Sequence, residues 1–330
     1  MEHTPFAIIC KVPQSEYEGI GYPTKVRIHV QVETTSGWFD VSFANNSDAW
    51  WEYMPTLPPT RVANVAATVF YKNNDTRLIK AFHLFANRLD RDWRFQFIVY
   101  TGVPHFFLND PLVQEEMENG RLEIFERPPL EYKAFARAQL QPEYWEQMHG
   151  DRVLLFQADS VPCSGTIYKI SDFYNYTYVG APWCYFNHRG GNSGLSMRNK
   201  TAIIDLLRTY KSRIDQALRN PNFVLEDVLI CLSFHPHITH PRIALSFISS
   251  FVCGAGEIGT DNNLGFAPKS VGLHFSVETE YSPKPWGIHD PWPSIHGKNW
   301  EELLESCPEI HQVIPQQYGK VYYAPCQPGR

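Results

Sequence analysis

The chain has 330 residues, of which 43% are hydrophobic and 19% are charged, and its formal net charge is −6. This composition is ordinary for one large globular domain with a small appendage. Because no long Lys/Arg run occurs, a protein that reads the nucleic-acid backbone is excluded. No stretch approaches the roughly 20 apolar residues that span a bilayer, so no membrane span is predicted.

The seven cysteines are scattered and form no C-x-x-C pair. This pattern predicts reduced thiols rather than a disulfide framework. The N-terminus lacks the basic and apolar regions of a signal peptide, so we predict a cytoplasmic enzyme. A trimmed secretory-pathway protein is the alternative. Triplets for N-glycosylation begin at Asn74 and Asn199, although such triplets also arise by chance.

The first elements along the chain are strands. Residues 1–60 alternate apolar and polar in short runs, which predicts a β-rich N-terminal extension, and the prolines near residue 60 predict a boundary to a second domain at 61–330. Residues 62–70 then predict a buried strand, residues 75–89 a helix capped by Asp75, and residues 95–100 another strand. Such a β-α-β unit implies a parallel sheet.

Further along, we predict a strand at 122–125, a helix at 130–148 and an apolar strand at 153–156. The last strand ends abruptly in polar residues. Because ligands of open α/β sheets bind outside the carboxyl ends of the strands, chemistry is expected just after residue 156.

Four segments carry candidate functional residues. The first, residues 157–161, reads Gln-Ala-Asp-Ser-Val. A carboxylate at a strand end can hold a divalent cation that bridges a diphosphate, since phosphates and waters complete the coordination shell. Asp159 is therefore a candidate metal ligand, and an aspartate that merely opens a turn is the alternative.

The second segment, residues 190–198, contains three glycines. They predict a backbone turn that approaches a ligand closely, while Asn192 and Ser193 offer hydrogen bonds of the kind that sugar hydroxyls need. A plain glycine-rich turn before a helix at 201–207 is the alternative.

The third segment places Glu226 and Asp227 at the start of an apolar helix. Acids at a helix N-terminus are stabilised by the helix dipole, so capping is one interpretation. A general base that deprotonates an acceptor hydroxyl is the other.

The fourth segment, residues 285–292, places His289 among Gly and Pro, which predicts a loop. Its imidazole is a candidate ligand that favours Mn²⁺ over Mg²⁺. The flanking Trp286 and Trp292 could stack on a sugar face, and a buried, hydrogen-bonded histidine is the alternative.

Two other patterns are weaker. Residues 254–259 match the dinucleotide fingerprint, but helix-breaking residues follow them. Residues 235–240 hold three histidines, but prolines interrupt them and no cysteine spacing completes a zinc site.

Taken together and in order, these segments resemble a glycosyltransferase-like family that is common in fungi and bacteria. The family is largely catalogued as a domain of unknown function and is related to GT-A nucleotide-sugar transferases. The resemblance spans roughly residues 60–295, and we know no match for residues 1–55. The motifs are F-Q-x-D-S at 156–160, Y-x-Y-V-G-A-P-W at 176–183, G-N-G-G-L-S-x-R at 191–198, E-D-V at 226–228, F-S-x-E at 275–278 and G-x-H at 287–289.

The resemblance implies an α/β fold that is GT-A-like, or Rossmann-like, with a mixed, mostly parallel sheet flanked by helices. It also implies a glycosyltransferase that moves a sugar from a nucleotide-sugar donor, most simply a UDP-sugar, to an acceptor hydroxyl. Mn²⁺ or Mg²⁺ would be loosely held by Asp159 and His289. Asp227, with Glu226, would be the base of an inverting reaction. The implied donor-binding residues are Tyr71, Thr101, Gln157, Asp159, Ser160, Trp183, Gly191, Asn192, Ser193 and Gly194.

The sequence departs from the family pattern at two places. The second acid of a D-x-D motif is missing, because Ser160 and Val161 follow Asp159. The glycine segment reads Gly-Asn-Ser-Gly, so Ser193 would narrow the donor pocket. A catalytically silent carbohydrate- or nucleotide-binding protein on the same fold is the first alternative, and a nucleotidyltransferase the second. No oligomeric state is predicted.

Overall fold

The computed structural model divides the chain into two compact units, Met1–Pro59 and Thr60–Arg330. In the first unit, β1 (Arg27–Val30) pairs with β2 (Phe39–Ser42) in an antiparallel ribbon. The structure describes residues 27–30, 39–42, 62–70, 75–100, 102–128, 132–183, 191–219, 265–291, 295 and 297–314.

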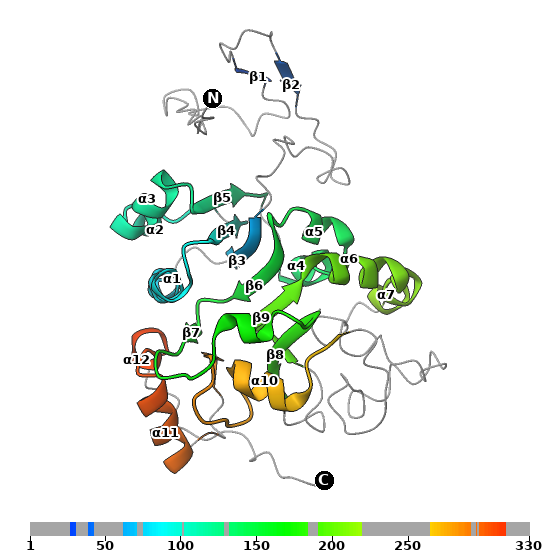
Figure 1. The fold of residues 1–330 in the computed structure, drawn as a ribbon. Helices are drawn as coiled ribbons and strands as arrows, with labels where there is room; N and C mark the ends of the chain where they lie inside the picture. Colours follow the sequence, from blue (N-terminus) through cyan, green and yellow to red (C-terminus); the bar gives the residue numbers. More distant parts are fainter. Residues whose placement is uncertain are drawn as a thin grey trace. The chain divides into compact units, whose positions relative to one another are not determined.

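The second unit is built on a six-stranded sheet in the order β5-β4-β3-β6-β9-β8 (Figure 1). The strands β5, β4, β3 and β6 are mutually parallel, β9 runs antiparallel to β6, and β8 runs antiparallel to β9. The predicted mixed, mostly parallel sheet is therefore confirmed. The six strands are β3 (Val62–Phe70), β4 (Trp93–Val99), β5 (Leu122–Glu126), β6 (Gly150–Phe156), β8 (Tyr178–Pro182) and β9 (Gly191–Asn199).

The predicted β-α-β unit is present. Helix α1 (Arg77–Arg88) connects β3 to its parallel neighbour β4. Thr76 occupies the N-cap position without a side-chain hydrogen bond, whereas Asp75 accepts a hydrogen bond from the Arg77 backbone N–H at 3.1 Å. Asp75 is therefore not the N-cap that was predicted, but it supports the start of the helix from one position farther out.

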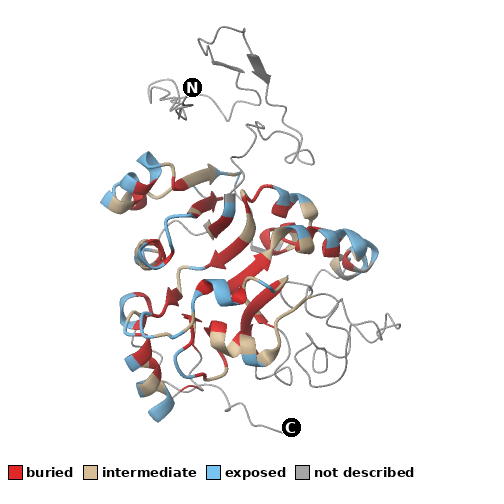
Figure 2. Ribbon diagram, in the orientation of Figure 1, coloured by how far each residue is buried: buried red, intermediate tan, exposed pale blue. Residues whose placement is uncertain are grey.

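Side chains alternate across the central strands, so the sheet separates two apolar cores. Figure 2 shows the central strands mostly in red, the colour of buried residues. In β6, Leu154 and Phe156 pack in the core under α1, while Val153 and Leu155 pack in the core under α5 (Pro142–Glu146) and α6 (Lys200–Thr209). Because helices cover both faces, the strands read as continuous apolar runs.

Two predicted elements differ from the structure. The helix expected at 130–148 is broken into α4 (Tyr132–Ala138) and α5, because Pro142 has no N–H and cannot continue a helix but suits the first turn of a new one. The glycine-rich turn expected at 190–198 is the strand β9. Pairing of β9 with both β6 and β8 supplies the hydrogen bonds that its weak strand propensity does not favour by itself.

A small three-stranded sheet, β10-β11-β7, lies beside the C-terminal helices. Its strands are β7 (Ser160–Pro162), β10 (Ser276–Val277) and β11 (Gly287–His289). The remaining elements are α2 (His105–Leu108), α3 (Pro111–Glu118), η2 (Ile170–Phe173), α7 (Lys211–Leu218), α10 (Lys269–Phe275), α11 (Lys298–Ser306) and α12 (Ile310–Val313). Within the described ranges, no helix combines the length and the apolar character that crossing a membrane requires.

The expectation of reduced thiols is wrong for one pair of cysteines. Cys163, directly after β7, forms a disulfide with Cys307 at the end of α11, and both residues are fully buried. The two residues lie 144 positions apart in the chain, with Cα atoms 4.5 Å apart. The spacing of the two cysteines gives no sign of this pair, because they meet only in the folded chain, where α12 packs against β7 and α1.

Candidate active site

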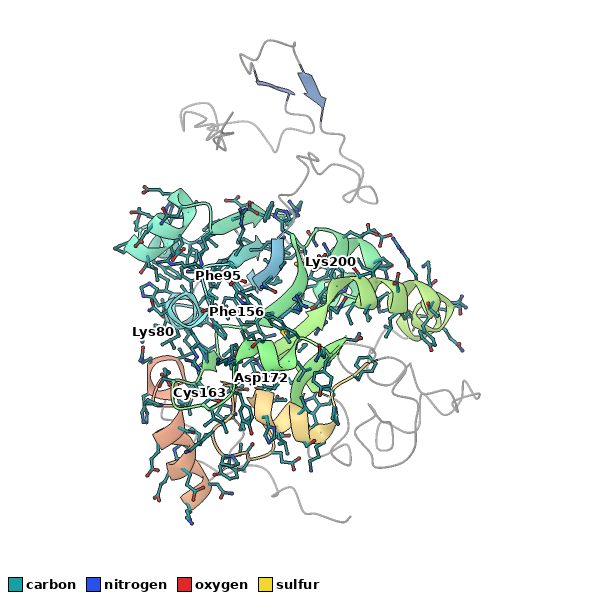
Figure 3. All side chains as sticks on the ribbon, viewed as in Figure 1. Lys80, Phe95, Phe156, Cys163, Asp172 and Lys200 are labelled. Atoms are coloured by element: carbon teal, nitrogen blue, oxygen red, sulfur yellow. A yellow bond between two sulfur atoms is a disulfide. The ribbon has the colours of Figure 1, made fainter. Side chains whose placement is uncertain are left out.

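The candidate site lies where β6 ends, in the turn that leads to β7. Figure 3 labels Phe156, the last residue of β6, and Cys163, the residue after β7. Inside the turn, the Ser160 backbone N–H donates to the Gln157 carbonyl at 3.1 Å, and the Gln157 N–H donates to the Ser160 hydroxyl oxygen at 3.1 Å. These bonds fix the backbone from which Asp159 projects.

Asp159, in this turn, faces His289 of β11. Strand β11 runs antiparallel to β7 and pairs His289 with Ser160, which places the imidazole Nε2 3.4 Å from Asp159 Oδ1 and 3.2 Å from Gln157 Oε1. The Asp290 backbone N–H donates to the Asp159 carbonyl at 3.2 Å and closes the contact. The structure thus brings together three of the residues singled out in the sequence.

Burial and charge act in opposite directions on this pair. Burial by itself would lower the pKa of His289, but the hydrogen bond and negative charge of Asp159, with the charges of Glu278 and Asp290, raise this pKa to about 9. Burial would raise the pKa of Asp159, but its contacts with His289 and the charge of Arg77 lower it. The metal-free pair is therefore an imidazolium and a carboxylate at neutral pH.

A third charged side chain reaches the same turn from the first β-α junction. Arg77, at the start of α1, places Nη1 3.7 Å from Asp159 Oδ2. The Asp75 carboxylate accepts two hydrogen bonds from the Arg77 guanidinium, from Nε at 2.8 Å and from Nη2 at 2.6 Å. These hydrogen bonds are the main reason that the pKa of Asp75 is lowered. Sequence reasoning missed Arg77, although an Asp-x-Arg pair after a buried strand was a usable signal.

The glycine segment supports the site from the side of β9. A Cβ atom at Gly194 would overlap the imidazole ring of His289, so only glycine fits there. The sequence predicted that the backbone of this segment approaches a ligand closely, whereas Gly194 closely approaches the side chain of His289. The Asn192 side chain accepts a hydrogen bond from the Gly194 N–H, and the Ser160 hydroxyl donates to the Gly194 carbonyl at 3.0 Å.

Glu278 is a second residue that sequence reasoning left without a role. It is buried behind His289, with Oε1 3.9 Å from His289 Nδ1, and the same oxygen accepts a hydrogen bond from Asn192 Nδ2 at 3.0 Å. Glu278 thereby ties the glycine segment to the histidine. Its place at the end of the F-S-x-E motif was the signal for it.

The aromatic residues proposed to contact the sugar pack inside the protein. Trp286 is 1% exposed and stacks on Phe275 at 5.5 Å between ring centroids, so it belongs to the core and is not free to cover a sugar. Trp183, after β8, is also buried. The loop predicted around His289 is the short strand β11, and His289 is itself buried.

Several predicted site residues lie outside the described residues. These are Tyr71, Thr101, Glu226, Asp227 and Trp292, as well as the weaker patterns at 235–240 and 254–259. The base assignment of Asp227 and the donor-base contacts of Tyr71 and Thr101 therefore stay predictions.

Asp159 and His289 suit a divalent cation that takes most of its ligands from elsewhere. Their facing atoms are close enough to share one ion, because the buried Asp159 Oδ1 lies 3.4 Å from His289 Nε2, and a shared ion would replace this contact. No group of three His, Cys, Asp or Glu side chains suited to a metal occurs among the described residues. A cation here would need phosphate oxygens and waters to complete its shell, and it would displace the proton of His289.

The fold and the site together define an α/β protein with a charged cluster at the carboxyl ends of parallel strands. The sequence profile of a family described as "Protein of unknown function (DUF5672)" matches residues 123–289, half of the chain. The chain belongs to this family. No curated protein matches it.

Several solved structures with partial similarity to this chain are named as glycosyltransferases. They include the glycosyltransferase GlyE of Streptococcus pneumoniae TIGR4, with 11% identity, a TM-score of 0.36 and coverage of 51% of this chain and 42% of that one. The bifunctional WbbM has 10% identity, a TM-score of 0.38 and coverage of 84% and 53%. The mannosyltransferase Ktr4p of S. cerevisiae has 11% identity, a TM-score of 0.33 and coverage of 49% and 62%.

This chain thus spans less than half of the length of GlyE. TM-scores of this size are too low to fix a fold, so the fold described here rests on the sheet topology itself.

Proposed function

We propose that this protein is a glycosyltransferase that takes a sugar from a nucleotide-sugar donor, with a UDP-sugar as the first candidate, and transfers it to an acceptor hydroxyl. The observation that carries the proposal is the Asp159–His289 pair at the carboxyl end of β6. Ligands of open α/β sheets bind at this edge. The resemblance of six ordered motifs to a GT-A-related family supports the same reaction class.

The donor diphosphate would lie over the turn between β6 and β7. Asp159 and His289 would hold Mn²⁺ or Mg²⁺, and the ion would offset the negative charge that develops on the departing nucleoside diphosphate. Arg77, 3.7 Å from Asp159, would add a fixed positive charge beside the phosphates. Gly194 and Asn192 would hold His289 in place from behind.

The acceptor side of the proposal rests on the E-D-V motif. Asp227 would accept the proton of the acceptor hydroxyl, and Glu226 would orient the acceptor, which gives inversion at the anomeric carbon. If an Asp227→Asn variant turned over as fast as the parent while Glu226→Gln did not, the roles of the two acids would have to be exchanged.

One observation favours a binding protein without catalysis as the second candidate. In a D-x-D motif the second acid would stand at residue 161, but Val161 is a fully buried core residue of β7. The cation would therefore have a single carboxylate from this turn. A protein that binds a nucleotide sugar without turning it over needs no more than that.

A thermal-unfolding panel of nucleoside diphosphates and nucleotide sugars, each with and without Mn²⁺, tests the proposal. A ligand at 100 times its dissociation constant stabilises the folded state by about 2.7 kcal/mol. We expect a metal-dependent shift that Asp159→Ala removes and Asp215→Ala keeps, because Asp215 is a solvent-facing acid of α7 paired with Lys211.

Release of nucleoside diphosphate from the stabilising donor separates the two candidates. Release that depends on Asp159 supports the transferase, whereas stabilisation without any release supports the binding protein. A panel without any shift would contradict both.

A further inference from the structure

The buried disulfide bears on the compartment in which this chain folds. Cys163 and Cys307 are both inaccessible to solvent, and the Gly165 N–H donates to the Ser306 carbonyl at 2.9 Å beside the bond. In Figure 3, Cys163 lies next to the C-terminal helices that the bond holds. Structural disulfides persist in oxidising compartments and are rare in the cytosol.

The second observation is an N-glycosylation triplet that the sequence analysis did not single out. Four Asn-x-Ser/Thr triplets occur in the chain, beginning at Asn45, Asn74, Asn175 and Asn199. Asn175 is exposed in the turn between η2 and β8, and its triplet ends at Thr177. An exposed turn is where an acceptor asparagine of a secreted protein is expected.

Asn199 offers a contrast within the same chain. Its side chain caps α6 by accepting a hydrogen bond from the Ala202 N–H at 3.0 Å, and its own N–H donates to the Thr177 carbonyl at 2.9 Å. An oligosaccharide on this side-chain amide would crowd the first turn of the helix. Asn45 and Asn74 lie outside the described residues.

We propose that Asn175 carries an N-linked oligosaccharide, attached in the oxidising compartment in which the Cys163–Cys307 disulfide forms. The amide nitrogen of Asn175 forms a bond to the anomeric carbon of a polyprenyl-diphosphate-linked oligosaccharide. The bond from that carbon to the diphosphate oxygen breaks, and the amide proton leaves to a base. The proposal replaces the cytoplasmic location predicted from the sequence, and it is independent of the proposed function.

The sheet topology keeps such a modification away from the candidate active site. Asn175 precedes β8, whose first residue Tyr178 pairs with Arg198 of β9, and Arg198 pairs in turn with Val153 in the middle of β6. Three residues of strand, about 10 Å at 3.3 Å per residue, separate Val153 from the end of β6 where the site begins. An oligosaccharide at Asn175 therefore leaves the strand ends accessible.

The test uses the full chain, expressed from its own gene in the organism that encodes it. An amidase that hydrolyses the side-chain amide bond of a glycosylated asparagine releases the oligosaccharide as a glycosylamine and leaves aspartate at that position, which peptide mass spectrometry detects. We expect conversion at residue 175 and a gel-mobility shift on digestion. The shift should be lost in Asn175→Gln and Thr177→Val and kept in Thr177→Ser, which preserves the triplet. It should also be kept in Thr201→Val, which removes only the Asn199 triplet.

Peptide mapping without reductant is the second measurement, because it should recover a linked peptide pair containing Cys163 and Cys307. An unmodified Asn175 in the protein from its own organism would overturn the glycosylation proposal. A mobility shift in Asn175→Gln as large as that of the parent would overturn it equally, since the oligosaccharide would then lie elsewhere. Free, alkylatable Cys163 and Cys307 would overturn the assignment to an oxidising compartment.

Discussion

At the residue scale, the candidate site depends on a glycine, Gly194, at a position that has no room for a side chain. Gly194 lies so close to the imidazole of His289 that a methyl group in its place would have to displace the ring. Overpacking of this kind forces side chains and backbone to shift. The glycine therefore sets the position of His289 relative to Asp159. The hydrogen bond from the Gly194 N–H to the Asn192 side chain in turn holds the glycine in place.

We predict that Gly194→Ala lowers the free energy of unfolding by about 1–3 kcal/mol and weakens binding of Mn²⁺ to the protein. Gly191→Ala is the matched control in the same strand, because its Cβ would lie 3.2 Å from the Tyr178 ring and needs only a small adjustment. Urea unfolding and calorimetric titration with Mn²⁺ measure the two effects. Equal losses in both variants would contradict the role assigned to Gly194.

The Asp159–His289 pair predicts a pH dependence for the metal-free protein. The pKa of His289 is raised from 6.5 to about 9, so its contribution to stability is complete below pH 6.5 and is lost as the pH rises through 9. The size of the contribution is on the order of 3 kcal/mol. The lowered pKa of Asp159 describes the same contact from the acid side, where stability is lost as the pH falls through that pKa.

Urea unfolding between pH 6 and pH 10 checks this prediction. The decline in the free energy of unfolding above pH 7 should be markedly smaller in Asp159→Asn, because the neutral amide no longer favours the imidazolium. A variant whose pH profile parallels that of the parent would show that the pair does not control the decline.

At the scale of elements, one buried arginine joins the end of α1 to β4. Arg121 donates to the carbonyls of Leu89 at 2.9 Å and Trp93 at 3.0 Å, and to the Glu116 carboxylate at 3.0 Å. It also contacts the carbonyls of Ala86 and Asp90. The carbonyls of Ala86, Leu89 and Asp90 belong to the end of α1 and the turn after it, where a helix leaves carbonyl groups without partners, so a planar guanidinium with five donors suits the position.

We predict that Arg121→Lys costs about 3 kcal/mol of unfolding free energy, since an ammonium group cannot satisfy this set of acceptors and Glu116 stays buried. Arg91→Lys is the control: Arg91 also binds Glu116, at 2.9 Å, but its side chain is 72% exposed. The control should lose less than about 1 kcal/mol. Chemical denaturation of the two variants under one condition decides the comparison.

At the scale of the whole molecule, the disulfide closes a long section of the second unit. It ties the loop after β7 to the end of α11, and the next helix, α12, packs against α1 and β7. Cross-links across long loops remove much conformational entropy from the unfolded chain. The bond therefore stabilises the elements that carry Arg77 and Asp159.

We predict that Cys163→Ala lowers the free energy of unfolding by about 2–5 kcal/mol. Cys307→Ala and the double variant should lose nearly the same amount, because either change removes the whole bond. Thermal unfolding without reductant measures the loss, and addition of a reductant should bring the parent towards the variants once the bond becomes accessible. A double variant that loses the sum of the two single losses would show that packing, and not the bond, sets the effect.

The sequence by itself determined the β3-α1-β4 unit, β5 and β6, because uninterrupted apolar runs and one amphipathic helix leave few alternatives. The mixed sheet was implied by the family resemblance and not by these patterns. It also identified Asp159 and His289 as candidates. The sequence could not show that the glycine segment is a strand, that Trp286 is a core residue, or that helix 130–148 is broken. Each of these depends on which neighbour covers the segment.

Only the tertiary structure decided what surrounds the candidate residues. His289 lies 130 positions from Asp159 in the sequence, and the pairing of β11 with β7 alone places the two side chains 3.4 Å apart. The same holds for Arg77 beside Asp159 and for Cys163 bonded to Cys307. Local propensity acts over a few residues, whereas sheet pairing and core packing bring distant parts of the chain together, so contacts of this kind cannot be read from spacing.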